Sequence, residues 1–152
     1  MDTIVVGYDG SEPARRALEF AAQEAQLRGA RLRVVSAWQV TPAAYGGGFA
    51  PPLDQQALDA FREHAEHLVE DAREAVYRDR PDLQVGVATP EGQAAACLLE
   101  EARQATLIVV GNRGHGGFSS LLLGSVSQQV VQHAHCPVIV VPHEPERESS
   151  SR

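Results

Sequence analysis

The chain has 152 residues, of which 43% are hydrophobic and 22% are charged, and it carries a formal net charge of −7 at pH 7. A chain of this length and composition is long enough for one globular domain with a sizeable core, and short for two. The acidic balance argues against a nucleic acid as partner, because such binding needs many basic contacts to phosphate.

The first part of the chain alternates apolar runs with helical patterns. Residues 3–9 form a short β-branched run that predicts a buried strand. Ser11 and Pro13 predict the start of a helix, because serine accepts hydrogen bonds from free amides of the first turn and proline is tolerated there. Gly29 marks the end of that helix, and a second strand is expected over residues 31–38.

A long loop and a long helix follow. Residues 39–53 contain three prolines and a run of three glycines, which predict a surface loop. The pattern over residues 54–79 predicts a helix that Pro81 ends. The core positions expected on that helix share one face: Ala57, Phe61, Ala65, Leu68, Ala72 and Val76.

The rest of the chain continues the alternation. Strands are expected over residues 83–89, 106–110 and 136–141, and helices over 92–104 and 126–134. Most strands are short apolar runs, and each connection is long enough for a crossover helix. The pattern therefore predicts a doubly wound α/β fold, with a five-stranded parallel sheet covered by helices on both faces.

One domain is expected over residues 1–142, followed by a polar tail, 143–152, that we expect to be disordered. Cys97 and Cys136 have no CxxC partner and are expected to be small buried residues. No apolar run approaches the roughly 20 residues of a membrane helix, and the first residues lack the pattern of a secretory signal. We therefore expect a cytoplasmic protein that does not enter a membrane.

All 13 basic side chains are arginines, because the sequence contains no lysine. This excludes a P-loop NTPase, whose lysine meets the phosphates, and any enzyme that forms a Schiff base. It also excludes a response-regulator receiver, which needs a lysine after its fifth strand. Backbone amides, hydroxyl groups or arginine must therefore bind any phosphate.

Two loops are rich in glycine and small polar residues: residues 7–11 after the first strand and residues 111–125 after the fourth. In a doubly wound sheet the ligand binds outside the carboxyl ends of the strands, where the strand order reverses. If the order is 3-2-1-4-5, the first and fourth strands are neighbours there, and both loops line one crevice.

The second of these loops has the chemistry of an anion site. Glycines let the backbone approach a ligand closely, and the first free N–H groups of the following helix point outward at Ser125. Arg113 or His115 can offset the charge of a phosphate, although Arg113 can equally face solvent. The glycines and hydroxyls concerned are Gly111, Gly114, Gly116, Gly117, Gly124, Ser125 and Ser127. Loop glycines are also common as plain turn residues, so both interpretations stay open.

Asp9 ends the first strand at a level suited to hydrogen bonds with a ribose, or to holding a magnesium ion against phosphates. Ala37, at the end of the second strand, is placed to present backbone groups to the edge of an adenine. Gly10 and Ser11 belong to the same loop as Asp9. A strand-ending Asp-Gly pair is more often only a turn, and that alternative also stands.

The second loop also has a family pattern: Gly111, two residues, Gly114, nine residues, Gly124 and Ser125. This spacing resembles the nucleotide-binding motif G-x2-G-x9-G-[S/T] of the universal stress protein family. The likeness covers nearly the whole chain, through the stretches IVVGYDGSEPARRAL, VVSAW and LIVVGNRGHGGFSSLLLGSVSQQVVQHAHCPVIVV. Thr106 stands where the family often has Asp, and Asn112 where Ser or Thr is usual, but neither departure removes a glycine.

The resemblance implies the 3-2-1-4-5 sheet of the adenine nucleotide alpha hydrolase-like fold, and a homodimer paired through the fifth strand, over Pro137 to Val141. An apolar strand at a sheet edge invites such pairing. In the ATP-binding branch the ligand is ATP or a related adenine nucleotide, with magnesium at Asp9 as a further option. The matching positions around the nucleotide are Asp9, Ala37, Gly111, Arg113, Gly114, Gly124, Ser125 and Val126, and Gly10, Ser11, His115 and Gly116 complete the predicted site.

Three other functions compete with a nucleotide-regulated stress protein. A hydrolase is excluded, because the HGGF stretch resembles an oxyanion loop but no G-x-S-x-G elbow supplies a serine. A slow ATPase stays open, although no general base is evident and no catalytic residue is assigned. An interaction module with a vestigial site and an unknown protein partner also stays open. No metal ligand is assigned to the histidine pairs, which are His64 with His67 and His133 with His135.

Overall fold

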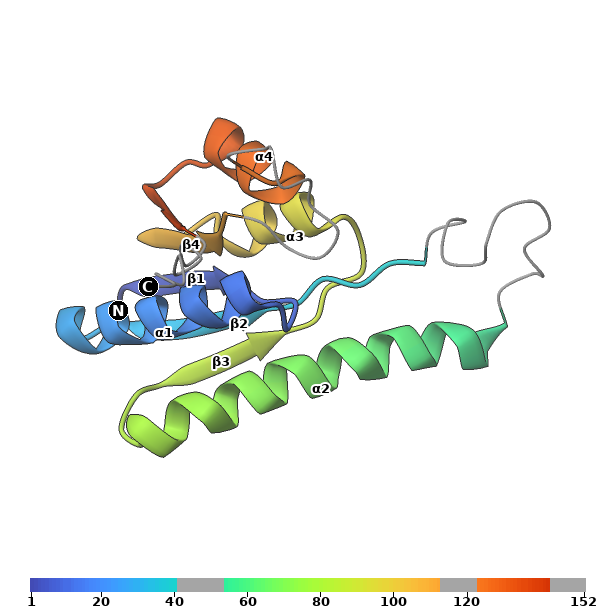
Figure 1. Cartoon of the computed structure of the whole chain (residues 1–152), viewed down its shortest axis with the longest axis horizontal. Coiled ribbons are helices and arrows are strands. Elements are labelled where there is room, and N and C mark those ends of the chain that lie inside the picture. The colour runs from blue at the N-terminus through green and yellow to red at the C-terminus, as the bar shows by residue number, and fades with distance from the viewer. Residues whose placement is uncertain (41–53, 113–122, 143–152) are drawn as a thin grey trace, which may run out of the picture.

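Five strands form one sheet, and their order across it is β3-β2-β1-β4-β5. The computed structural model describes residues 1–40, 54–112 and 123–142, and Figure 1 shows the sheet between its helices. The strands are β1 (Thr3–Gly7), β2 (Arg31–Val35), β3 (Val85–Ala88), β4 (Leu107–Gly111) and β5 (Val138–Val141). Every neighbouring pair is parallel, so the predicted fold class and strand order are confirmed. The tail over 143–152 and most of the loop over 39–53 lie outside the described residues.

The described helices cover both faces of the sheet. They are α1 (Glu12–Arg28), α2 (Gln55–Asp79), α3 (Ala94–Glu101) and α4 (Ser125–His133). One face is covered by α1 and α2, and the other by α3 and α4 (Figure 1). α3 is shorter than the expected 92–104, because Gly92 has a φ of +142° and Ala102 already ends the helix.

The central strand β1 packs into both layers. Its Ile4 and Val6 contact the core under α1 and α2, whereas Val5 contacts the core under α3 and α4. All three are 0% exposed. The buried face of α1 is mostly alanine, which lets the helix lie close to the sheet: Ala14, Ala17, Leu18, Ala21, Ala22 and Ala25. The loops after β1 and β4 therefore start from firmly packed strands.

α2 has 25 residues and runs beyond the edge of the sheet (Figure 1). Its buried side chains are Ala65, Val69, Ala72 and Val76. The predicted core stripe is therefore wrong at Ala57, Phe61 and Leu68, which are only half-buried. The first part of α2 runs past the strands (Figure 1), and Phe61 and Leu68 line a cavity. Near the other end of the helix, Arg80 Nη2 lies 2.9 Å from Glu19 Oε1 on α1 and ties the two helices together.

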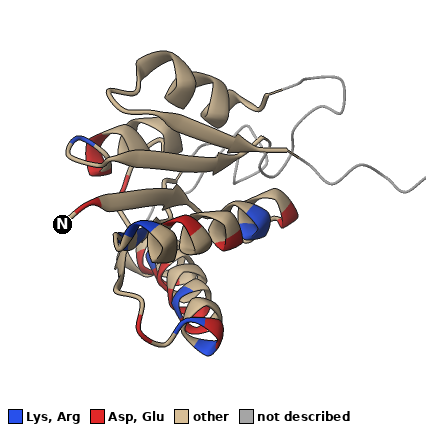
Figure 2. Cartoon of the chain, turned by 90° about the vertical axis from the view of Figure 1, so that its left-hand side faces the viewer, with Lys and Arg blue, Asp and Glu red and all other residues tan. Residues whose placement is uncertain are grey.

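Charged side chains gather on the layer of α1 and α2 (Figure 2). By contrast, α4 and β5 contain no Lys, Arg, Asp or Glu. In the part of the chain that the structure describes, none of the helices has the length and apolarity needed to cross a membrane. The edge strand β5 and the helix α4 therefore carry no Lys, Arg, Asp or Glu side chain.

Candidate functional site

The turn after β1 is held by its own side chains. The Asp9 carboxylate accepts hydrogen bonds from the N–H of Ser11, at 2.9 Å, and from the Ser11 hydroxyl. Ser11 Oγ accepts the N–H of Ala14, at 3.3 Å, and so caps α1 as predicted. Gly10 supplies the φ of +80° that this turn requires. Ser11 is buried, and its hydroxyl bonds within this turn and to the first turn of α1.

A cavity of about 340 Å³ lies at the carboxyl ends of β1 and β2, against α2. Two residues of the predicted site, Asp9 and Ala37, line it together. The α2 wall of the cavity includes Phe61, His64 and Leu68, which the sequence analysis did not assign to the site. Their spacing of three and four residues along one helix was the available signal, but Phe61 and Leu68 were assigned to the core stripe and His64 to a histidine pair.

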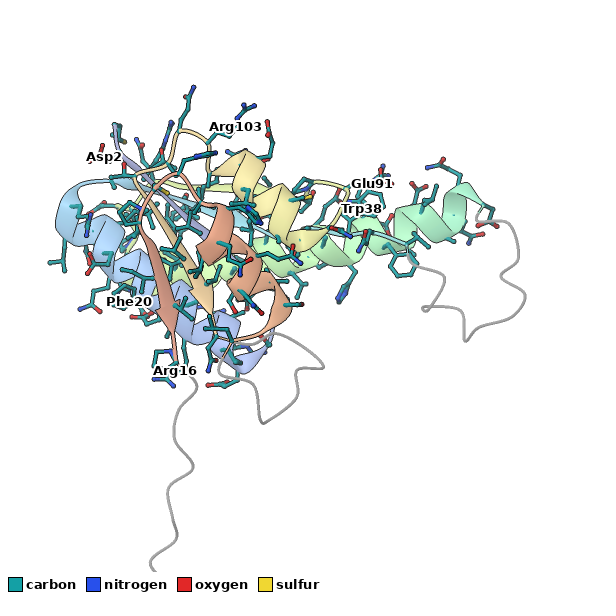
Figure 3. The ribbon with its side chains drawn as sticks, turned by 90° about the horizontal axis from the view of Figure 1, so that it is seen from above. Asp2, Arg16, Phe20, Trp38, Glu91 and Arg103 are labelled. Atoms are coloured by element: carbon teal, nitrogen blue, oxygen red, sulfur yellow. The ribbon has the colours of Figure 1, made fainter. Side chains whose placement is uncertain are left out.

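Hydrogen bonds fix the end of β2 beside this cavity. The N–H of Trp38 donates to the carbonyl of Pro90 at 3.1 Å, and its carbonyl accepts the N–H of Gly92 at 2.9 Å. The indole Nε1 of Trp38 donates to the Thr89 carbonyl at 3.0 Å. Trp38 and Glu91 thus form a parallel bridge beyond the ends of β2 and β3, where Figure 3 places their side chains near each other. The backbone next to Ala37 is therefore held in place.

Gly111, the first glycine of the motif, lies against the start of α1. A Cβ atom built at this position would lie 2.8 Å from the carbonyl carbon and the Cβ of Pro13, and 2.9 Å from its oxygen. Side-chain atoms do not pack at such distances from a fixed backbone, so only glycine fits. The close approach that Gly111 allows is therefore one between β4 and α1.

Backbone bonds close the base of the long loop between β4 and α4. The N–H of Asn112 donates to Val141 at 3.0 Å, and the Asn112 carbonyl accepts the N–H of Gly124 at 2.6 Å. Gly124 precedes α4 with a φ of −72° and a ψ of 169°, and no side chain of the described residues caps this helix. Ser125 is exposed and Val126 is half-buried. The first-turn amides of α4 thus lack a capping oxygen in the described chain.

The Ser127 hydroxyl, which the sequence analysis expected to bind phosphate, is buried and bonds to backbone carbonyls. Ser127 is 2% exposed, and its hydroxyl lies 3.0 Å from the carbonyl oxygen of Asn112. Four residues of the predicted site lie outside the described residues: Arg113, Gly114, His115 and Gly116. The described remainder falls into two halves on either side of β1, because β1 pairs with β2 on one side and with β4 on the other. The cavity lies on the β2 side and the start of α4 lies on the β4 side.

The described part of the chain offers no reactive thiol or metal site. Cys97 is buried as expected, and burial, followed by the nearby Glu101 carboxylate, raises the pKa of its thiol. Cys136 is only half-buried, and burial raises its pKa as well. Both thiols therefore stay protonated near neutral pH and are poor nucleophiles. Across residues 1–40, 54–112 and 123–142, no three His, Cys, Asp or Glu side chains are grouped to hold a metal ion.

The sequence is similar to known proteins over most of its length. A model described as the universal stress protein family matches residues 1–142. A universal stress protein of Thermus aquaticus is 40% identical over 141 residues, which cover 91% of this chain and 97% of that protein. A universal stress protein of Mycobacterium tuberculosis is 39% identical over 158 residues, which cover 93% of this chain and 48% of that protein. The chain thus spans about half the length of this mycobacterial relative.

Solved structures show the same arrangement. Universal stress protein UspA from Lactobacillus plantarum matches with a TM-score of 0.77 and 26% identity, over 92% of this chain and 97% of that one. A universal stress protein in complex with cAMP matches with a TM-score of 0.68 and 26% identity, over 92% and 96%. A universal stress protein from Archaeoglobus fulgidus in complex with dAMP matches with a TM-score of 0.67 and 25% identity, over 93% and 98%.

Proposed function

This chain belongs to the universal stress protein family, and from that premise we propose that it binds an adenine nucleotide, ATP above all, across the carboxyl edge of its sheet. The bound nucleotide regulates a homodimer that acts in the stress response of the cytoplasm. Relatives of the same fold that were solved with cAMP and with dAMP support the ligand class.

The observation that carries the proposal is the placement of a cavity and of a helix start that no described side chain caps, on opposite sides of Asp9. The cavity takes the adenine, with the backbone of Ala37 at the edge of the base. Asp9, at the end of the central strand, faces the ribose. The phosphates lie at the amides of Ser125 and Val126, where a helix start favours an anion.

Several weak contacts must act together at this site. A helix terminus contributes about 0.3 to 1 kcal/mol to anion binding, and up to about 2 where it is partly buried. Micromolar affinity needs about 8 kcal/mol. The remainder comes from the base in its cavity, from the ribose, and from the loop residues: Gly10, Ser11, Gly111, Arg113, Gly114, His115, Gly116 and Gly124.

A magnesium ion fits the chemistry of this site as a companion of the phosphates. Magnesium is usually held by one or two carboxylates, phosphate oxygens and waters, and Asp9 is the carboxylate on the cavity wall. When bound, the ion would neutralise phosphate charge in a chain that has no lysine. The residues of the chain would bind and orient the nucleotide. We assign no general base, and at most weak ATP hydrolysis.

A second part of the proposal is a homodimer paired through β5. The carbonyls of Pro137 and Val141 accept the N–H groups of Ile108, on β4, and of Asn112, directly after β4. Because bonding alternates along a strand, Val138 and Val140 direct their backbone groups to the open edge of the sheet. This edge strand is apolar and partly exposed, and an uncharged α4 lies beside it. A second copy would cover it.

The nucleotide proposal is tested by mass spectrometry of small molecules released from the purified protein, together with thermal shifts with ATP, AMP and cyclic AMP. At a ligand concentration of 100 Kd, binding adds about 2.7 kcal/mol to stability. We expect Gly124→Val or Gly114→Val to abolish binding while the fold is kept. Gly86→Val is the control, because a Cβ at Gly86 meets only Arg33 Nη1, at 3.9 Å. A protein without nucleotide or shift refutes the proposal and favours an interaction module.

The dimer is tested separately by light scattering over a range of concentrations. Val140→Pro removes one outward N–H but none of the bonds to β4, so we expect monomers that keep the fold. Val131→Gln is the control, because it changes only an exposed side chain of α4. A proline at Val131 would break the helix and could not serve as a comparison. A dimer that persists in Val140→Pro would place the interface elsewhere.

A further inference from the structure

Ser127 is a buried hydroxyl at the base of the proposed phosphate loop. It is the third residue of α4, is 2% exposed, and its Oγ lies 3.0 Å from the carbonyl oxygen of Asn112 and 3.1 Å from that of Gly124. A hydroxyl has one proton, so the two carbonyls share it. The bond to Gly124 is local, but the bond to Asn112 spans 15 residues and crosses the loop.

Neither carbonyl needs this hydroxyl to be satisfied. Asn112 already accepts the N–H of Gly124, and Gly124 already accepts the N–H of Gln128, at 3.0 Å. A buried hydroxyl costs more to desolvate than a methyl group, so an alanine would suit a site beside the buried Val130 as well. What the serine adds is a geometric link between the end of β4 and the first turn of α4.

We propose that Ser127 is a positioning residue, which holds the first turn of α4 at the height where its amides meet the phosphates of a nucleotide. The inference rests on the proposed nucleotide site. Asn112 is itself fixed by its N–H bond to Val141, so Ser127 joins the helix start to two strands at once. Ser125 and Val126 lie between the bonded residues Gly124 and Ser127, and their amide positions follow from this link.

The effect of Ser127 falls on the phosphates and not on the base, because the cavity lies on the other side of β1. We expect Ser127→Ala to weaken ATP binding about fivefold, the usual effect of one hydrogen bond. The affinity for adenosine, which has no phosphate, stays unchanged. Both affinities are measured by isothermal titration calorimetry on the full chain, well below the melting temperature.

A matched control separates positioning from lost stability. Val130 is 0% exposed on the same helix, one turn further on, and its side chain has no group that can form a hydrogen bond, so Val130→Ala lowers stability through packing alone. We expect Val130→Ala to keep the ratio of the ATP and adenosine affinities of the unmodified chain. Amide hydrogen exchange without ligand gives a second readout, since the Gly124 N–H should exchange faster in Ser127→Ala and not in Val130→Ala.

The outcomes distinguish this inference from the proposed function. If the unmodified chain binds ATP and Ser127→Ala binds it equally well, the positioning role is overturned and the nucleotide site stands. An equal loss of ATP and adenosine affinity in Ser127→Ala also overturns it, because the change is then general. If the unmodified chain binds no nucleotide, the proposed function and this inference fall together.

Discussion

α1 and α4 both begin at the carboxyl ends of the strands, after the neighbouring strands β1 and β4. Their first-turn amides nevertheless differ in the hydrogen-bond acceptors that they have. At α1, Ser11 Oγ accepts the N–H of Ala14, and Asp9 in turn holds Ser11. At α4, the residue before the helix is Gly124, which has no side chain to offer. The first start has its own acceptor, whereas no side chain among the described residues provides one for the second, and a helix start favours an anion.

Serine has opposite functions at the two helix starts. Ser11 stands before its helix and accepts an N–H, as a cap does. Ser127 stands inside the first turn, and its hydroxyl donates to carbonyls. A serine side chain thus caps α1, whereas at α4 it links the first turn of the helix to the end of β4. Variants that add a capping side chain at α4, or remove the one at α1, test this comparison.

The largest effect is expected at Gly111, the last residue of β4, where this strand touches the start of α1. Gly111→Ala places a Cβ 2.8 Å from backbone and side-chain carbon atoms of Pro13, and neither segment can move without unpacking β4 or α1. We expect a loss of about 2 to 3 kcal/mol in the free energy of unfolding, measured in urea. In a chain of this size that lowers the melting temperature by about 5 to 10 °C.

Gly86→Ala is the matched control, because its Cβ finds only Arg33 Nη1 at 3.9 Å on an exposed strand position. We expect its stability to stay within about 0.5 kcal/mol of the unmodified chain. If Gly111→Ala is equally harmless, the contact between β4 and α1 is not as close as described. Only contact with a ligand would then require a glycine at this position.

Much of this comparison was accessible from the sequence. The apolar runs predicted the order of strands and helices, and the residue types at Ser11 and Gly29 predicted both ends of α1, as the structure confirms. The function of Gly111 was not accessible, because the need for glycine there depends on Pro13, which is distant in sequence. The α2 wall of the cavity was missed for a similar reason. Helical spacing tells which face of α2 is apolar, but not that Phe61 and Leu68 line a cavity on that face.

The next effect is expected when the start of α4 is given a cap of its own. Gly124 has a φ and ψ that any residue can adopt, so Gly124→Asp places a carboxylate beside the first-turn amides. We expect the affinity for ATP to fall at least about tenfold, since the carboxylate competes with phosphate for the same amides. Stability without ligand should rise by about 0.3 to 1 kcal/mol. Calorimetric titration and urea unfolding measure the two quantities.

Gly124→Asn separates charge from capping in that test. Asparagine caps a helix about as well as aspartate but carries no charge. We expect an affinity for ATP between those of the unmodified chain and Gly124→Asp. Undiminished ATP affinity in Gly124→Asp would mean that the phosphates lie away from α4, and that the start of this helix binds no anion.

The smallest of these effects is expected when the start of α1 loses its cap. Ser11→Ala removes the acceptor of the Ala14 N–H and one of the two bonds that Ser11 donates to Asp9, so it should cost about 1 kcal/mol of unfolding free energy. Asp54→Ala is the control: Asp54 caps α2 through the N–H of Ala57, at 2.9 Å, but is exposed. Water can replace an exposed cap, whereas the buried amide at α1 has no substitute, so Ser11→Ala should cost more than Asp54→Ala in the same urea titration. Equal costs in Ser11→Ala and Asp54→Ala would mean that water reaches the first turn of α1. The starts of α1 and α4 would then differ in sequence but not in whether their first-turn amides need a partner from the protein.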